Sequence, residues 1–189
     1  MTVLTTERLI LRDWTDDPAD LARIYDIYSR PEVSRYLGMA SGLPMTNPAQ
    51  AVERLRIWQE RHADDGGRYG TWAIEVRETG QVVGTVLLKP LPGRDESRRT
   101  DDIEVGWHLH PDAWGHGYAT EAAHAAVARE FAAGTREIYA VVSPSNEPSM
   151  AVARRLGMRH VGQRTDWYGG ELLETFVLTA QMPDRSRTT

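Results

Sequence analysis

Two neighbouring stretches decide the fold of this chain: residues 104–111 read EVGWHLHP and residues 114–122 read WGHGYATEA. The first alternates apolar with polar or small side chains, a period of two that is typical of a β-strand. The second carries Gly115 and Gly117 and runs into an alanine-rich segment that favours a helix. With the apolar stretch 138–142 beyond it, the sequence predicts a strand, a turn, a helix and a second strand.

Outward from this unit, the first half of the chain is predicted to be mainly helical after one opening strand. The period of apolar residues, the turn residues and the prolines set the bounds. We expect a strand at 3–12, helices at 18–28, 31–36 and 47–64 with a loop at 38–48 between them, a hairpin of 71–76 and 82–88, an exposed loop at 90–102, a helix at 146–156 and two last strands at 158–167 and 172–180 around the 168–170 turn.

Length and composition indicate one domain over residues 1–182, followed by a frayed tail at 183–189. The chain has 189 residues, 41% of them hydrophobic, which suits a single core. Its 22 basic and 27 acidic residues give a net charge of −5, so we expect neither a nucleic-acid nor a membrane-surface binder. Without cysteine there is no disulfide or zinc-thiolate site, and no apolar run spans a bilayer. We therefore expect a cytoplasmic protein.

The glycine pair between strand and helix predicts an anion site. Glycine permits close approach of the backbone, and the free N–H groups of the next helical turn attract phosphate. A Walker loop is excluded because no Gly-Lys-Ser or Gly-Lys-Thr follows, and the Rossmann pattern fails because Thr120 takes its last position. By itself the pair is equally compatible with a plain tight turn.

Further residues resolve that choice. Residues 104–111 with 114–122 resemble the acetyl-CoA-binding motif of the GNAT family of N-acetyltransferases, especially its RimJ/RimL-like branch. Residues 146–158, with an Asn, a Ser three positions on and a Leu-Gly-hydrophobe close, resemble the next motif of that family. The resemblance runs from about residue 5 to 180, with Trp114 in place of the Gln or Arg that often opens the phosphate loop.

The resemblance implies an α/β (α+β mixed-sheet) fold, the GNAT acyl-CoA N-acyltransferase fold, in which strands 103–109 and 138–142 splay apart to admit the pantetheine arm of acetyl-CoA. It implies that backbone groups near Leu109 and His110 bond that arm as an added strand would. Asn146 is expected to contact the same arm and Arg154 the nucleotide phosphates. The pyrophosphate is expected on the amides of Gly115, His116, Gly117, Tyr118, Ala119 and Thr120.

For chemistry, the resemblance points to Ser149 near the leaving sulfur as general acid and to Glu104 on the central strand as general base. Each has an alternative. Ser149 also suits a helix-start hydroxyl that bonds a backbone amide, and Glu104 also suits an ion pair, with water taking the proton. His108, His110 and His116 with Asp112 raise the alternative of a metal site, but we predict no metal, because lone strand histidines are usually hydrogen-bonded or solvated.

The predicted function is transfer of an acetyl group from acetyl-CoA to a primary amine, either a protein N-terminal α-amine or a small-molecule amine. An α-amine is favoured over a lysine side chain because neutralising it costs less near pH 7. The acceptor is expected to be bounded by the N-terminal helices, the 38–48 loop and the 168–170 turn. A homodimer is also considered. The rivals are a non-catalytic acyl-CoA-binding regulatory module and a metal-dependent hydrolase that uses the histidines.

Overall fold

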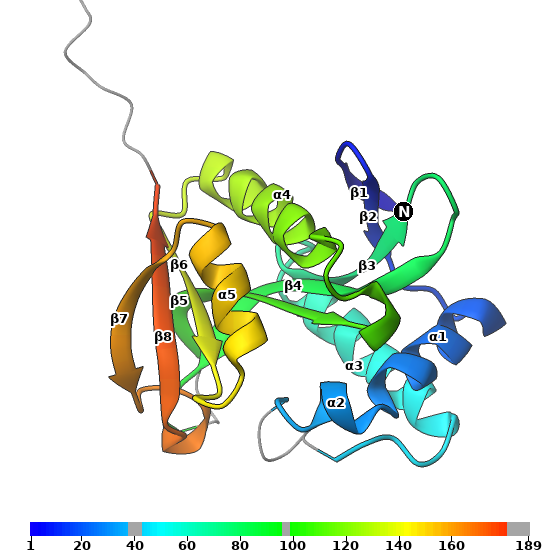
Figure 1. The fold of residues 1–189 in the computed structure, drawn as a ribbon, viewed down its shortest axis with the longest axis horizontal. Helices are drawn as coiled ribbons and strands as arrows, with labels where there is room; N and C mark the ends of the chain where they lie inside the picture. The colour runs from blue at the N-terminus through cyan, green and yellow to red at the C-terminus, as the bar shows by residue number, and fades with distance from the viewer. Residues whose placement is uncertain (38–42, 96–98, 181–189) are drawn as a thin grey trace, which may run out of the picture.

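The computed structural model describes residues 1–37, 43–95 and 99–180 and consists of one mixed sheet with helices on both faces (Figure 1). The sheet has eight strands in the order β1-β2-β3-β4-β5-β6-β8-β7. Their bounds are β1 Thr2–Thr5, β2 Leu9–Asp13, β3 Gly70–Val76, β4 Val82–Pro92, β5 Arg99–Leu109, β6 Glu137–Val142, β7 Arg159–Arg164 and β8 Leu173–Thr179. The fold is therefore the mixed α/β class that the sequence predicted.

The helices follow the caps and prolines of the sequence. Asp17 caps the first long helix through the amide of Ala19, and Asn146 caps the last through the amide of Ser149. The helices are α1 Pro18–Tyr28, α2 Pro31–Ser34, α3 Ala49–Asp64, α4 Tyr118–Ala132 and α5 Glu147–Arg155, with 3₁₀ turns at Pro111–Ala113 and Tyr168–Gly170. None of the described helices is long and apolar enough to cross a membrane.

Two buried clusters lie on opposite faces of the sheet. Trp72 and Ile74 of β3 belong to the cluster under α4 and α5, whereas Ala73 between them belongs to the cluster under α1, α2 and α3. This alternation is the period of two of a strand with both faces covered. Each face of the sheet therefore has its own set of helices, and the site described below lies between the two sets.

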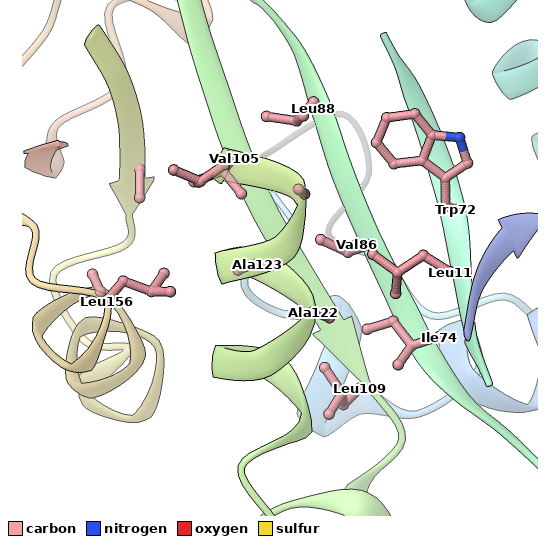
Figure 2. Close-up of a cluster of buried hydrophobic side chains, with 14 of the residues drawn as sticks. Leu11, Trp72, Ile74, Val86, Leu88, Val105, Leu109, Ala122, Ala123 and Leu156 are labelled. Carbon is pink, nitrogen blue, oxygen red and sulfur yellow. The ribbon is translucent and has the colours of Figure 1, made fainter. Parts of the chain in front are cut away.

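The alanines of α4 bring that helix close to the sheet. Ala122 and Ala123 are fully buried, and Figure 2 shows them beside Val86, Val105 and Leu109 of the central strands. A small side chain lets the helix backbone approach the strands, which fixes the first turn of α4 directly beyond the end of β5. The alanine-rich pattern thus sets the position of the glycine loop.

Three expectations from the sequence were wrong in detail. Residues 3–12 form two antiparallel strands, β1 and β2, because the chain turns at 6–8 and Thr6 bonds Leu9 across that turn. Most of the expected loop at 90–102 belongs to β4 and β5, whose pairing continues to Pro92 and Arg99 and buries Leu91. The prolines and charged residues of segment 90–102 predict a loop, but the pairing of β4 with β5 continues past Pro90 with an irregular register.

On α3, the spacing of Ala51, Val52, Leu55 and Trp58 predicts one inward face, but Val52 is 55% exposed. The expected loop at 38–48 falls partly and the tail at 183–189 wholly outside the described residues.

Leu88→Ala should lower the free energy of unfolding by about 2–5 kcal/mol, because Leu88 is fully buried between β3, β5 and α4 and its loss leaves a cavity. Leu172→Ala is the matched control, since Leu172 is 49% exposed, and it should change stability by less than about 0.5 kcal/mol. Urea unfolding followed by circular dichroism measures both. Equal losses in the two variants would contradict the assigned core.

Candidate active site

The two central strands part immediately after they meet. β5 and β6 run parallel and pair only at Ile103 with Ile138 and at Glu104 with Tyr139. Beyond these pairs β5 continues along β4 and β6 continues along β8. Figure 1 shows the two strands running in diverging directions from that point. The splay that the sequence resemblance implied is confirmed.

The backbone of β5 faces this gap at alternate residues. The N–H of His110 donates to the carbonyl of Val83 at 3.0 Å, and hydrogen-bonded pairs alternate along an antiparallel ladder. The peptide groups of Trp107 and Leu109 therefore point away from β4, toward the gap. An extended ligand arm can bond to them as an added strand would.

Leu109 and His110 differ in what they offer. The Leu109 carbonyl accepts from the indole of Trp114 at 3.0 Å, which leaves its N–H toward the gap. Both backbone groups of His110 already bond within the chain, its carbonyl to the amide of Ala113. The arm contact expected of Leu109 thus fits the geometry, while the one expected of His110 stays a prediction. Trp107, which sequence reasoning did not select, has both of its peptide groups on that edge.

The glycine loop presents a row of free amides. Gly115 and Gly117 have φ of +80° and +79°, a conformation that side chains rarely adopt, and Gly117 begins α4 without a side-chain cap. Within the described chain, no peptide N–H of residues 115–120 has an acceptor. These amides, with the positive end of the α4 dipole, form an anion site. The free amides of this loop are compatible with the predicted phosphate site, and phosphate binding here stays a prediction.

Thr120 gives this cradle a side-chain donor. Its Oγ1 is buried and has no hydrogen-bond partner among the described residues. Buried hydroxyls are normally satisfied, so a ligand oxygen is a fitting partner. This orphaned atom, together with the free amides, fits the diphosphate of acetyl-CoA.

An ion pair from the start of the chain holds the loop in place. Arg8 donates to the Glu121 carboxylate at 2.7 Å through Nε and to the His116 carbonyl at 3.0 Å through Nη1. Thr6 Oγ1 donates to the same carboxylate at 2.6 Å. His116 stacks on Tyr118, with ring centroids 5.5 Å apart. The turn between β1 and β2 therefore braces the cradle, a role that sequence reasoning missed because the contact spans more than a hundred residues.

The second motif lies at the start of α5. Asn146 Oδ1 accepts from the amide of Ser149 at 3.2 Å, which leaves the side-chain NH₂ of Asn146 without a partner in the described residues. Ser149 Oγ makes no hydrogen bond to any described residue. Because Asn146 rather than Ser149 caps this helix, the capping alternative for Ser149 loses its support. Arg154 pairs with Glu147 at 2.5 Å on the exposed side of α5, and its contact with phosphates stays a prediction.

Glu104 lies where the strands part and is held by two neighbours. It is 7% exposed, accepts from the Tyr168 hydroxyl at 2.6 Å, and lies 3.4 Å from Lys89 Nζ. Lys89 also donates to the Tyr168 hydroxyl at 2.7 Å. Burial, and then the charge of Glu104, raises the pKa of Tyr168 far above its usual range, so this phenol stays protonated. Glu104 therefore forms the ion pair with Lys89 that was expected as its alternative role, and it also lies where β5 and β6 part.

Tyr168 itself is held in an unusual backbone conformation. Among the described non-glycine residues it alone has a positive φ, +49°. The sequence indicated only that a turn at 168–170 bounds the acceptor site. The contacts of the Tyr168 hydroxyl with Glu104 and Lys89 could not be predicted from the sequence, since they depend on how that turn packs against β4 and β5.

The histidines serve separate partners. His108 Nδ1 lies 3.0 Å from the Tyr28 hydroxyl, and burial, with the charges of Arg54 and Lys89 nearby, lowers its pKa to about 3. His110 Nε2 lies 3.4 Å from Asp26, and His116 Nδ1 lies 2.9 Å from the Trp114 carbonyl. In the described ranges, no three His, Asp or Glu side chains gather in a way that could hold a metal ion.

Comparison with known proteins now settles the family. The sequence profile of the acetyltransferase (GNAT) domain matches residues 8–159. The chain belongs to the GNAT family. GNAT acetyltransferases use acetyl-CoA, so this chain is an acetyl-CoA-dependent acetyltransferase.

Individual relatives agree with that assignment. An uncharacterized N-acetyltransferase of Bacillus subtilis, YoaA, is 32% identical over 161 residues, which cover 85% of this chain and 84% of YoaA. The solved structure of an acetyltransferase from Agrobacterium tumefaciens superposes with a TM-score of 0.73 at 24% identity and 95% coverage of both chains. An acetyltransferase of Salmonella typhimurium that modifies the N-terminal serine of ribosomal protein L7/L12 superposes with a TM-score of 0.73 at 13% identity, covering 96% of this chain and 100% of that one.

The Glu121 brace should make stability depend on pH. Burial by itself raises the pKa of Glu121, but hydrogen bonds from Thr6 and Arg8 outweigh it, and the folded-state pKa lies below the ordinary value. The contribution of ionised Glu121 to folding stability is then fully present above the unfolded-state pKa of about 4.3 and is lost as the pH falls through the folded-state pKa. Glu121→Gln should lower Tm at pH 7 by about 2–4 °C, since solvent screens the pair, and the gap should close in acid.

Calorimetric Tm values of the wild type and Glu121→Gln between pH 3 and 8 test this. Glu53→Gln, whose pair with Arg56 is exposed on α3, is the control and should shift Tm by less than a degree or so. A gap between Glu121→Gln and wild type that stays constant down to pH 3 would show that the carboxylate charge does not brace the loop.

Proposed function

We propose that this chain transfers the acetyl group of acetyl-CoA to a primary amine by direct attack of the amine on the thioester. The observation that carries the proposal is the parting of β5 and β6 at Glu104, together with the loop of free amides that follows the far end of β5. This arrangement supports a thioester held beside a carboxylate that faces the acceptor side. The acceptor is either a protein N-terminal α-amine, as for the Salmonella enzyme, or a small-molecule amine.

The chain's own groups account for each proton and bond. Acetyl-CoA supplies the acetyl thioester. The peptide groups of Trp107 and Leu109 hold the pantetheine arm, while the 115–120 amides and the Thr120 hydroxyl hold the pyrophosphate, with Asn146 on the arm. As the amine nitrogen bonds the acetyl carbon and the carbon–sulfur bond breaks, the amine proton passes to Glu104, directly or through water. Ser149 donates its proton to the departing sulfur and regains one from solvent water, into which Glu104 releases the proton taken from the amine.

Positioning supplies most of the rate in such a transfer. Aligning amine and thioester within contact distance replaces a bimolecular encounter with a local one, worth about 7–11 kcal/mol at best. The tie between Tyr168, Lys89 and Glu104 fixes one wall of the acceptor side at distances below 3.5 Å. The chain therefore needs little strong acid or base.

Release of free CoA thiol over a panel of amines and N-terminal peptides tests the proposal. Thiol release that requires an amine, with the acetylated amine identified by mass spectrometry, is the expected result. Binding of acetyl-CoA without turnover for any acceptor would instead support the non-catalytic acyl-CoA-binding module and overturn transfer.

The glycine loop predicts a selective loss of cofactor affinity. Gly117→Asp places a carboxylate where phosphate is expected and should weaken acetyl-CoA binding by tenfold or more in calorimetry. Gly80→Asp is the matched control, because Gly80 also has a positive φ, +68°, and open space around it, but lies in the turn between β3 and β4. Similar affinities for the two variants would rule out the loop as the phosphate site.

Ser149→Ala should lower kcat by at least about tenfold and leave KM for acetyl-CoA within twofold, because a general acid acts mainly in the transition state. Ser145→Ala, in the loop before α5, is the control and should leave both constants unchanged. A fall in kcat below about threefold would remove Ser149 from proton transfer.

A further inference from the structure

One arginine on the acceptor side carries a charge that the described chain does not balance. Arg54 of α3 lies with its guanidinium carbon 4.5 Å from the centre of the Tyr28 ring. Its Nε is buried and has no hydrogen-bond partner, and no carboxylate of the described residues lies within ion-pair distance of it. Arg56, two residues further along α3, pairs with two glutamates. A buried, unpaired guanidinium nitrogen is costly, so its retention calls for a partner.

Arg54 is linked by contacts to the reaction edge. Beneath it, the Tyr28 hydroxyl bonds Thr85 at 3.2 Å and His108 at 3.0 Å. His108 lies on β5 beyond Glu104 and on the same face, because residues two apart on a strand point the same way. The charges of Arg54 and Lys89 both act on His108. The path from Glu104 to Arg54 therefore runs through neighbouring side chains of one face of the sheet.

This face is cationic in a chain whose net charge is −5. The carboxylate of Glu104 balances Lys89, and Arg61 and Glu171 act on Tyr168 with opposite signs, so Arg54 is the cation without a partner among these described groups. His108 adds no charge, because it stays neutral at physiological pH. Such a field opposes a protonated amine and attracts an anion.

A second donor in the same aromatic group also lacks an acceptor. Trp14 Nε1 is buried without a partner among the described residues, and its ring contacts Trp58, which in turn contacts Tyr28. Arg54 Nε and Trp14 Nε1 can only donate hydrogen bonds. These two buried donors are therefore suited to oxygen acceptors of a ligand.

We propose that Arg54 binds an anionic group of the acceptor, so that the preferred substrate is a small amine that also carries a carboxylate or a phosphate. The guanidinium fork matches either oxyanion through paired N–H donors, and the amine of the bound substrate lies on the Glu104 side of Arg54, where water can carry its proton to Glu104. Local positive charge also favours the neutral form of that amine, which is the form that attacks the thioester. The inference rests on the proposed acetyl transfer and specifies its acceptor.

Matched amine pairs test it: amino acids against their primary amides, and phosphoethanolamine against ethanolamine. The kcat/KM of thiol release is compared per unprotonated amine, because an amide group lowers the pKa of the amine beside it. Wild type should prefer the anionic member of a pair by roughly 10- to 100-fold, the usual worth of hydrogen bonds to a charged group. Whether the carboxylate or the phosphate pair shows the larger ratio identifies the anion.

The variants then assign the preference to Arg54. Arg54→Gln should abolish the ratio between the members of a pair while leaving kcat/KM for the neutral member within about threefold, and Arg54→Lys should keep part of the ratio. Arg56→Gln, on the exposed side of the same helix, should leave the ratio unchanged. An unchanged KM for acetyl-CoA and a Tm within a few degrees of wild type show that Arg54→Gln is folded.

Three results would overturn the inference. One is a wild-type preference for the neutral amines, and another is a preference for peptides with uncharged N-terminal residues. The third is an Arg54→Gln variant that loses activity equally on both members of each pair, which would make Arg54 a packing residue on Tyr28. Thiol release with neutral amines would keep the proposed acetyl transfer standing in all three cases, whereas no release with any amine would overturn the transfer and the inference together.

Discussion

The two backbone pairs between β5 and β6 are the constraint on which the rest of this molecule depends. Every other neighbouring pair of strands in the sheet is antiparallel, and this one parallel contact ends at Glu104 and Tyr139. Since the two strands are held elsewhere by β4 and β8, they cannot close the gap beyond that point. The same geometry opens an edge of unpaired peptide groups, sets Glu104 at its apex, and aims the end of β5 at the loop before α4.

The fold and the backbone conformation of the glycine loop could be predicted from the sequence because they depend on local patterns. Glycine at 115 and 117, a helix-start asparagine at 146 and the alternation along 103–109 act through backbone conformation, which neighbours in sequence largely decide. The full length of β4 and β5 could not be predicted from the sequence. Prolines at 90 and 92 argue locally for a loop, yet the long pairing of the two strands overrides that preference.

The acceptor side was predicted least well, since its groups meet only through the tertiary fold. The contacts of Tyr168 with Glu104 and Lys89 join three separate segments. Three segments also meet where Arg54 contacts Tyr28 and the Tyr28 hydroxyl bonds His108. No spacing rule connects them. Sequence reasoning identified Glu104 as an acidic residue of the central strand and candidate general base, but only the fold shows its contacts with Tyr168 and Lys89.

The loop before α4 is tied down at both of its ends. The Trp114 indole bonds the last carbonyl of β5, and Arg8 bonds the carbonyl of His116 while gripping Glu121 in the first turn of the helix. A loop restrained in this way has little conformational entropy left to lose when a diphosphate arrives. More of the attraction between amides and phosphate then remains as net affinity. The exposed tryptophan at position 114 thus restrains the start of the loop through its indole, without a charged side chain there.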